Sequence, residues 1–159
     1  MSTIDAPPLT TPTVQGPPPH ILIVRAPYYR EVVDGMTEGA AQLLGAAGAT
    51  HEILDVAGAF ELPQAIRIAL RGRQRFDGFV ALGCVVRGET DHYEFICAAT
   101  MQGLMNVALQ FGIALGSGLL TVDTLAQAVA RSSGRDNKGA EAAAASLRQV
   151  DAARRLGAA

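Results

Sequence analysis

The residues best suited to chemistry in this chain lie in the sequence RGETDHYE, which follows a run of apolar residues. Gly88 lets an anion approach the backbone, Thr90 adds a hydroxyl group, and His92 can donate or accept a proton near neutral pH. Asp91 and Glu94 are spaced like a capping box, which predicts a helix that begins near His92. The amides just before that helix would lack partners and would attract a phosphate. We therefore expect a phosphorylated substrate here, with His92 as acid or base.

A packing role is the competing interpretation of this turn. A strand, a glycine turn and a capped helix follow one another in every parallel α/β protein, and a histidine in a first helical turn is commonly a solvated surface residue. The surrounding elements must therefore decide whether other reactive side chains meet at the same place.

The chain predicts strands that alternate with helices. The strands are short apolar or β-branched runs, and the helices carry apolar residues at helical spacing. This alternation predicts an α/β fold, a three-layer sandwich with a four-stranded parallel sheet flanked by helices. The helix after RGETD is apolar nearly all round, which is typical of burial inside a domain or against a neighbouring subunit. The expected strands are 21–24, 51–56, 79–86 and 118–122, and the expected helices are 30–47, 62–71, 92–111, 124–131 and 140–156.

The strand ends supply further candidate residues. Ligands of parallel sheets bind at the carboxyl ends of the strands, which here read PYY, AGAFE, RGETDH and VDT. Tyr28 and Phe60 could stack on a planar ring, or could instead cap the core. Lys138 is the only lysine, and a phosphate-binding role competes with an ordinary position at a helix start. Arg131 has the same two interpretations at a helix end.

Composition narrows the function classes. With 159 residues, 49% hydrophobic and 18% charged, the chain suits one domain with a substantial core. The net charge of −2 and the lack of a basic stripe argue against nucleic acid, and neither a membrane span nor a signal peptide is evident, so we expect a cytoplasmic protein. Cys84 and Cys97 are expected to be buried free thiols rather than metal ligands.

The N-terminal segment differs from the rest of the chain. Residues 1–19 contain six of the eight prolines and little apolar periodicity. This composition predicts a disordered proline-rich arm, with a single domain over residues 20–159.

Several ordered motifs give the chain a resemblance to a known family. These are VAGAFELP at 56–63, FDGFVALGCVVRGETDHYEF at 76–95, LLTVDTLAQA at 119–128 and NKGAEAA at 137–143. Over residues 21–156 the sequence resembles the lumazine synthase family. The resemblance implies a flavodoxin-like fold of the lumazine synthase type.

The same resemblance implies a transferase of riboflavin biosynthesis. It would condense 5-amino-6-(D-ribitylamino)uracil with L-3,4-dihydroxy-2-butanone 4-phosphate to 6,7-dimethyl-8-ribityllumazine, releasing phosphate and water. No cofactor and no metal would be needed. The family also implies a homopentamer, with a 60-mer shell as a larger alternative, and riboflavin synthase as the recipient of the product.

The resemblance implies roles for individual residues. His92 would be catalytic and transfer protons, Tyr28 would stack on the pyrimidine, and residues 88–90 would hold phosphate. Arg131 would reach that phosphate from the adjacent subunit. Tyr29 and Ser117 depart from the usual asparagine and aromatic residue of the family. The implied substrate-binding residues are Tyr28, Ala59, Phe60, Glu61, Val85, Val86, Gly88, Glu89, Thr90, Ser117, Arg131 and Lys138.

Two other function classes remain open from the sequence. The chain could be a noncatalytic module that holds a flavin or lumazine, or a protein whose main role is to build a hollow shell. The presence of His92 and Arg131 favours the enzyme, because a pure binder needs no proton-transfer group beside a phosphate site.

Overall fold

The sheet of this protein is parallel throughout and has the strand order β2-β1-β3-β4. The structure is a computed structural model and describes residues 8–158. The predicted α/β class is confirmed. The strands are β1 (His20–Arg25), β2 (Thr50–Asp55), β3 (Gly78–Val86) and β4 (Ala114–Val122).

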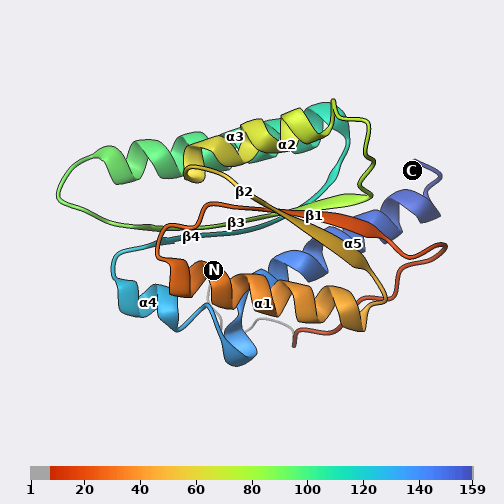
Figure 1. Cartoon of the computed structure of the whole chain (residues 1–159), viewed down its shortest axis with the longest axis horizontal. Helices are drawn as coiled ribbons and strands as arrows, with labels where there is room; N and C mark the ends of the chain where they lie inside the picture. Colours follow the sequence, from red (N-terminus) through yellow and green to blue (C-terminus); the bar gives the residue numbers. More distant parts are fainter. Residues whose placement is uncertain (1–7, 159) are drawn as a thin grey trace.

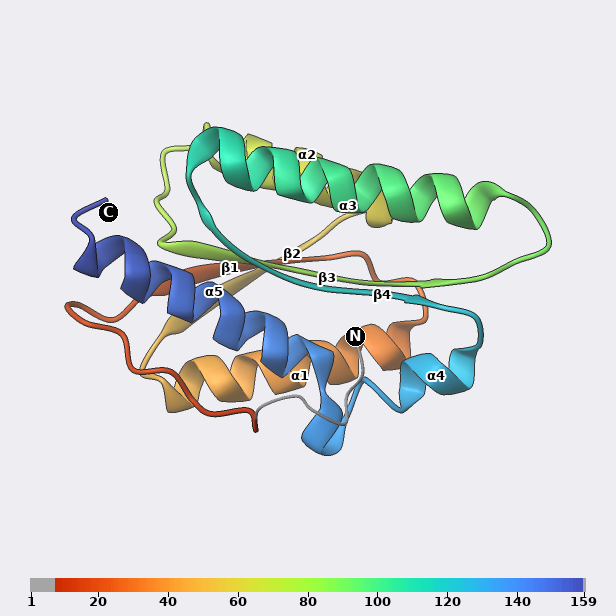
Figure 2. The same cartoon turned by 180° about the vertical axis from the view of Figure 1, so that it is seen from behind.

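Helices cover both faces of the sheet. Figure 1 and Figure 2 show α2 and α3 on one face and α1, α4 and α5 on the other. Among residues 8–158, no helix is long and apolar enough to cross a membrane. The helices are α1 (Arg30–Ala46), α2 (Leu62–Ala69), α3 (His92–Phe111), α4 (Leu125–Val129) and α5 (Lys138–Arg155), with short 3₁₀ turns η1 (Ala59–Glu61) and η2 (Gly134–Asp136).

The core forms as two layers because successive strand residues point to opposite faces of the sheet. Ile21 and Ile23 of β1 belong to the buried cluster formed with α1 and α5. Leu22 and Val24 belong to the cluster formed with α2 and α3. In the central strand β3, Gly78 through Cys84 are all buried, as the apolar run predicted. The two layers hold the carboxyl ends of the strands at one edge of the sheet.

Helix α5 packs unusually close to its neighbours because small residues line the contact. A β-carbon at Gly116 of β4 would lie 1.8 Å from the carbonyl oxygen of Ala142, and one at Gly139 would lie 1.9 Å from that of Met36. The glycines therefore let α5 approach both the sheet and α1. Strand β4 begins at Ala114, four residues before the expected start. The apolar run from which the strand was predicted is interrupted by Gly116 and Gly118, but both glycines pair in register with β3.

The N-terminal arm has defined contacts over its described residues, 8–19, which contain no helix or strand. The amide of Gln15 donates to Asp151 of α5 at 3.0 Å. The guanidinium of Arg154 donates to the carbonyl oxygens of Gln15 and Pro17, both at 2.7 Å, and to Asp77 at 3.0 Å. The arm thus lies against α5 where disorder was expected, because the backbone carbonyls of a proline-rich chain can accept these bonds. Residues 1–7 of the predicted arm lie outside the described residues.

Helix α3 leaves much of its apolar surface uncovered in a single chain. Its buried residues are Thr100, Leu104 and Val107. Phe95 is 72% exposed and Leu109 is 75% exposed. The core of one chain therefore does not account for the apolar character of this helix.

Candidate active site

A cavity of about 400 Å³ lies at the carboxyl ends of the strands. This volume is within the usual range for small-molecule sites. Several segments far apart in the sequence contribute to it: the β1–α1 turn, the β2–α2 turn, the end of β3 and the first turns of α3. The lining residues are Ala26, Tyr28, Tyr29, Ala57, Gly58, Ala59, Phe60, Glu61, Cys84, Val85, Val86, His92 and Ile96.

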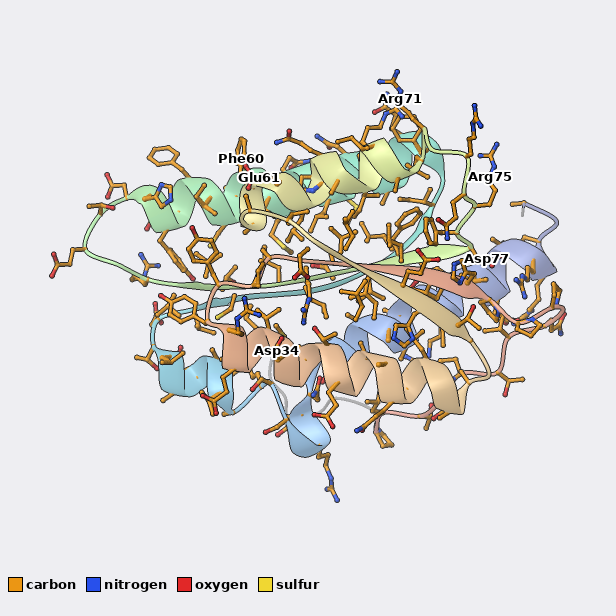
Figure 3. All side chains as sticks on the ribbon, viewed as in Figure 1. Asp34, Phe60, Glu61, Arg71, Arg75 and Asp77 are labelled. Atoms are coloured by element: carbon orange, nitrogen blue, oxygen red, sulfur yellow. The ribbon has the colours of Figure 1, made fainter. Side chains whose placement is uncertain are left out.

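Two exposed aromatic rings border this cavity. Tyr28 is 63% exposed and Phe60 is 49% exposed. Neither ring therefore caps the core, which was the alternative to a stacking role. Figure 3 shows Phe60 and Glu61 together at the start of α2, whereas Arg75 and Asp77 lie beyond the other end of that helix.

A carboxylate and one of these rings both lie beside the backbone of Gly58. A β-carbon at Gly58 would lie 3.2 Å from Oε2 of Glu61 and 3.9 Å from Cε2 of Tyr28. The aromatic ring and the acid thus converge on the same piece of backbone. An aromatic surface and a hydrogen-bond acceptor at one site suit a polar heterocycle.

The imidazole of His92 lines the same cavity as Glu61 and Tyr28. His92 is the first residue of α3, which begins at the residue expected from the sequence. An exposed turn, Gly88 to Asp91, precedes it. Within the described part of the chain, the amides of Gly88, Glu89 and Thr90 make no hydrogen bond. They are available to an anion beside the positive end of the α3 dipole.

The predicted capping box at this helix start is wrong. Asp91 is the N-cap residue, but its side chain accepts no capping hydrogen bond. The carboxylate of Glu94 instead accepts a bond from Nη1 of Arg87 at 3.2 Å. A charged partner within reach competes more strongly than a backbone amide for this carboxylate. A capping box does occur between Thr124 and Gln127, at the start of α4.

Gly88, Glu89 and Thr90, also expected at the site, form the turn before α3 and do not line the cavity, and three further expected residues lie elsewhere in the single chain. Ser117 is on β4, with its hydroxyl 4.0 Å from the sulfur of Met101, and it lines a separate groove between α3 and α5. Arg131 follows α4 and donates to the carbonyl oxygen of Gln127 at 2.8 Å. Lys138 begins α5 and binds both carboxylate oxygens of Glu141 at 2.7 Å. Their contribution to a neighbouring site remains a prediction.

Sequence reasoning missed several residues of the cavity wall. Ala26, Ala57 and Gly58 lie at strand ends, so the rule that located the other turns also covers them. Ile96 is four residues after His92 and therefore lies on the same face of α3. Tyr29 also lines the cavity, and its backbone has a left-handed conformation with φ 53°.

The thiol of Cys84 also reaches the cavity wall, but it is poorly suited to nucleophilic chemistry. Burial raises its pKa to about 11. The thiol therefore stays protonated at neutral pH, and the thiolate is the reactive form. Among residues 8–158, no group of three or more histidine, cysteine, aspartate or glutamate residues is placed to hold a metal ion.

Comparison with known proteins points to a single family. The family model described as 6,7-dimethyl-8-ribityllumazine synthase matches residues 18–154. A protein of Rhizobium meliloti named 6,7-dimethyl-8-ribityllumazine synthase 1 is 45% identical over 146 residues, covering 89% of this chain and 95% of its own. Proteins with the name 6,7-dimethyl-8-ribityllumazine synthase in Paramagnetospirillum magneticum and Nitrobacter winogradskyi are 42% and 45% identical, and each match covers 86% of this chain and respectively 96% and 86% of the relative.

Proposed function

The chain belongs to the 6,7-dimethyl-8-ribityllumazine synthase family, and from this membership we propose how its cavity makes that product. The enzyme acts in riboflavin biosynthesis. It condenses 5-amino-6-(D-ribitylamino)uracil with L-3,4-dihydroxy-2-butanone 4-phosphate and releases phosphate and water. One observation carries the proposed mechanism: exposed rings, a carboxylate and an imidazole share one cavity beside a turn with free amides.

We assign the pyrimidine substrate to the aromatic side of the cavity. Tyr28 offers an exposed ring for stacking, and the adjacent Glu61 carboxylate accepts hydrogen bonds from ring or ribityl donors. Ala59 and Phe60 line the same wall, and Val85 and Val86 form the floor at the end of β3. The amine of the uracil is then held facing the α3 helix start.

The phosphate of the second substrate belongs at the turn before α3. The free amides of Gly88, Glu89 and Thr90 suit its oxygens, and the helix dipole favours its charge. Arg131 and Lys138 would complete this pocket from the adjacent subunit, and Ser117 would border the pyrimidine from there. Support for this arrangement comes from their position outside the cavity of their own chain.

The reaction then requires orientation and proton transfer. The substrate amine attacks the ketone, phosphate leaves by elimination, and the second ring closes with loss of water. His92 moves the protons, since it lines the cavity together with the aromatic residues and follows the phosphate turn in the chain. No covalent bond to the protein forms in this scheme.

We also propose a homopentamer, with the 60-mer shell as a larger assembly. The exposed apolar surface of α3, with Phe95 and Leu109, supports a subunit interface there. Light scattering during size-exclusion chromatography would distinguish five chains of 16.6 kDa from sixty. Transfer of the product to riboflavin synthase and a cytoplasmic location are further predictions.

The decisive experiment supplies both substrates and follows lumazine absorbance. We expect formation well above the rate with heat-denatured protein, and none when either substrate is left out. A protein that binds added lumazine but forms none would be the noncatalytic carrier. Substrate-independent assembly without turnover would identify a shell protein.

A further inference from the structure

The charged side chain nearest the phosphate turn has no role in the scheme above. Arg87 comes directly after β3 and directly before Gly88. Its amide donates to the carbonyl oxygen of Val122 at 2.9 Å, which joins the carboxyl ends of β3 and β4. The next four residues are exposed. The backbone of Arg87 is thus anchored at the base of the turn.

The guanidinium of Arg87 holds three side chains from two other segments. Nε donates to Asp123, after β4, at 2.9 Å, and Nη1 donates to Glu94 in the first turn of α3 at 3.2 Å. Its Cζ lies 4.3 Å from the ring centroid of Tyr93. The hydrogen bonds that Arg87 donates to Asp123 and, second, to Glu94 raise the pKa of Arg87 above its ordinary value. The guanidinium therefore remains positively charged at every pH at which the enzyme is folded.

The turn depends on this arginine because it has few other restraints. Within the described residues, Gly88, Glu89 and Thr90 make no backbone hydrogen bond, and the N-cap Asp91 makes no side-chain cap. The segment is held at its two ends. Arg87 connects those ends, since Asp123 belongs to the strand side and Glu94 to the helix side.

Each ion pair alone would be weak. The side chains of Glu94 and Asp123 are both 67% exposed, and exposed pairs contribute little because water competes and two side chains must be ordered. Here one planar guanidinium binds both carboxylates and stacks on a ring. The conformational entropy of the arginine side chain is therefore lost only once for three contacts. These contacts therefore fix the position of the first turn of α3 but contribute little to the free energy of unfolding.

We propose that Arg87 is a positioning residue for the reaction: it sets the spacing between the amides of residues 88–90 and the imidazole of His92 by fixing the first turn of α3 to the end of β4. This inference rests on the proposed function of that turn. Tyr93 and Glu94 directly follow His92, so a shift of either contact moves the imidazole. Phosphate affinity and proton transfer would then depend on a group that touches neither substrate.

The test compares Arg87→Met, which keeps most of the stem and removes the fork, with Arg154→Met. Arg154 is the matched control because it also makes several bonds, to Gln15, Pro17 and Asp77, but at the opposite edge of the sheet. We expect Arg87→Met to raise the KM for the butanone phosphate and the dissociation constant of inorganic phosphate by about tenfold to a hundredfold, the range that small misplacements produce. The KM for the uracil should change less than about twofold, and Arg154→Met should alter neither.

Two further variants separate positioning from direct contact. Glu94→Gln and Asp123→Asn each remove a negative charge beside Arg87. If Arg87 bound phosphate directly, each variant would strengthen phosphate binding by freeing the guanidinium. A positioning role predicts weaker binding in both, and little additional loss when Glu94→Gln is combined with Arg87→Met.

Calorimetric titration of inorganic phosphate makes the inference independent of turnover. If the wild type makes no lumazine, the proposed function fails, yet the effect of Arg87→Met on phosphate binding still tests the positioning. The inference is overturned if wild type and Arg87→Met bind phosphate with equal affinity, or if Arg87→Met binds both substrates more weakly by the same factor. Should Arg87→Met fail to fold, the two carboxylate variants carry the same test.

Discussion

At the residue scale, the three histidines lie at different edges of the sheet, and we propose a catalytic role only for His92. His20 and His51 lie at the amino ends of β1 and β2, where His20 bonds Thr50 at 2.8 Å. His92 lies at the carboxyl edge and lines the cavity. Parallel sheets bind ligands at that edge. The three imidazoles therefore allow a comparison in which only the location changes.

We expect His92→Ala to lower kcat by about a hundredfold to ten-thousandfold, the usual contribution of general acid-base catalysis. The dissociation constant of the uracil should stay close to that of the wild type, since stacking and Glu61 remain. Steady-state kinetics and equilibrium titration measure the two quantities, with His51→Ala as the matched control. A loss of affinity as large as the loss of turnover would make His92 a binding residue.

The buried thiol of Cys84 gives the stability of the enzyme a pH dependence. Burial raises its pKa from an ordinary value of 9.0 to about 11. Between these values the unfolded thiol loses its proton while the folded thiol keeps it. The unfolded state is therefore favoured increasingly as pH rises through this window, and stability is lost.

Urea denaturation of the wild type and Cys84→Ala across that window measures this effect. The wild type should be more stable below pH 9.0, where the thiol is neutral in both states, and this advantage should shrink steadily towards pH 11. If the difference in free energy of unfolding between wild type and Cys84→Ala does not vary with pH, the prediction is contradicted.

At the element scale, the start of α5 depends on one buried amide. Asn137 is 6% exposed and accepts hydrogen bonds from the amides of Gly139 and Ala140 at 2.9 and 3.1 Å. Its Nδ2 donates to the carbonyl oxygens of Gly35 and Ser132 at 2.9 and 2.8 Å. One side chain thus caps α5, joins it to α1 and closes the loop after α4. This cap also explains why α5 begins at Lys138, two residues before the expected start.

We expect Asn137→Ala to lower the free energy of unfolding by about 2 to 4 kcal/mol, since it removes an N-cap and leaves buried carbonyls without donors. Thr124→Ala, which removes only the exposed cap of α4, should cost about 1 kcal/mol. Urea denaturation compares the two. Equal losses would show that the bonds to Gly35 and Ser132 contribute nothing.

At the scale of the whole molecule, the two halves of the proposed site lie on opposite faces of one sheet. The cavity is lined by the β2–α2 turn and the first turns of α3, whereas Arg131 follows α4. Helix α4 lies on the face of the sheet opposite to α3 (Figure 2). A head-to-tail ring would bring the Arg131 face of one subunit to the cavity of the next. The exposed apolar residues of α3 would then become buried.

Subunit mixing tests this arrangement. His92→Ala and Arg131→Ala proteins, unfolded together in equal amounts and refolded, should regain activity because about one quarter of the interfaces pair an intact His92 with an intact Arg131. Lumazine formation is compared with each variant refolded alone. Differently tagged chains that elute together without regained activity would assign both residues to a pocket within one chain.

The sequence by itself determined the order and type of the elements, and therefore which turns meet. Apolar periodicity is a property of the local sequence, so it predicts helices and strands without knowledge of the fold. Helix α3 begins at His92 as expected, and β3 ends at Val86. A parallel sheet then places every carboxyl end at one edge, which brings Tyr28, Glu61 and His92 together.

Only the tertiary structure decided which partner each polar side chain takes. The carboxylate of Glu94 was equally able, from its spacing, to cap α3, yet it binds Arg87, whose other partner Asp123 comes 36 residues later. The arm lies against Arg154, more than 130 residues away in sequence. Such choices depend on distances between segments that no local pattern contains, because hydrogen bonds and ion pairs form only when the completed fold brings donor and acceptor within about 3 Å.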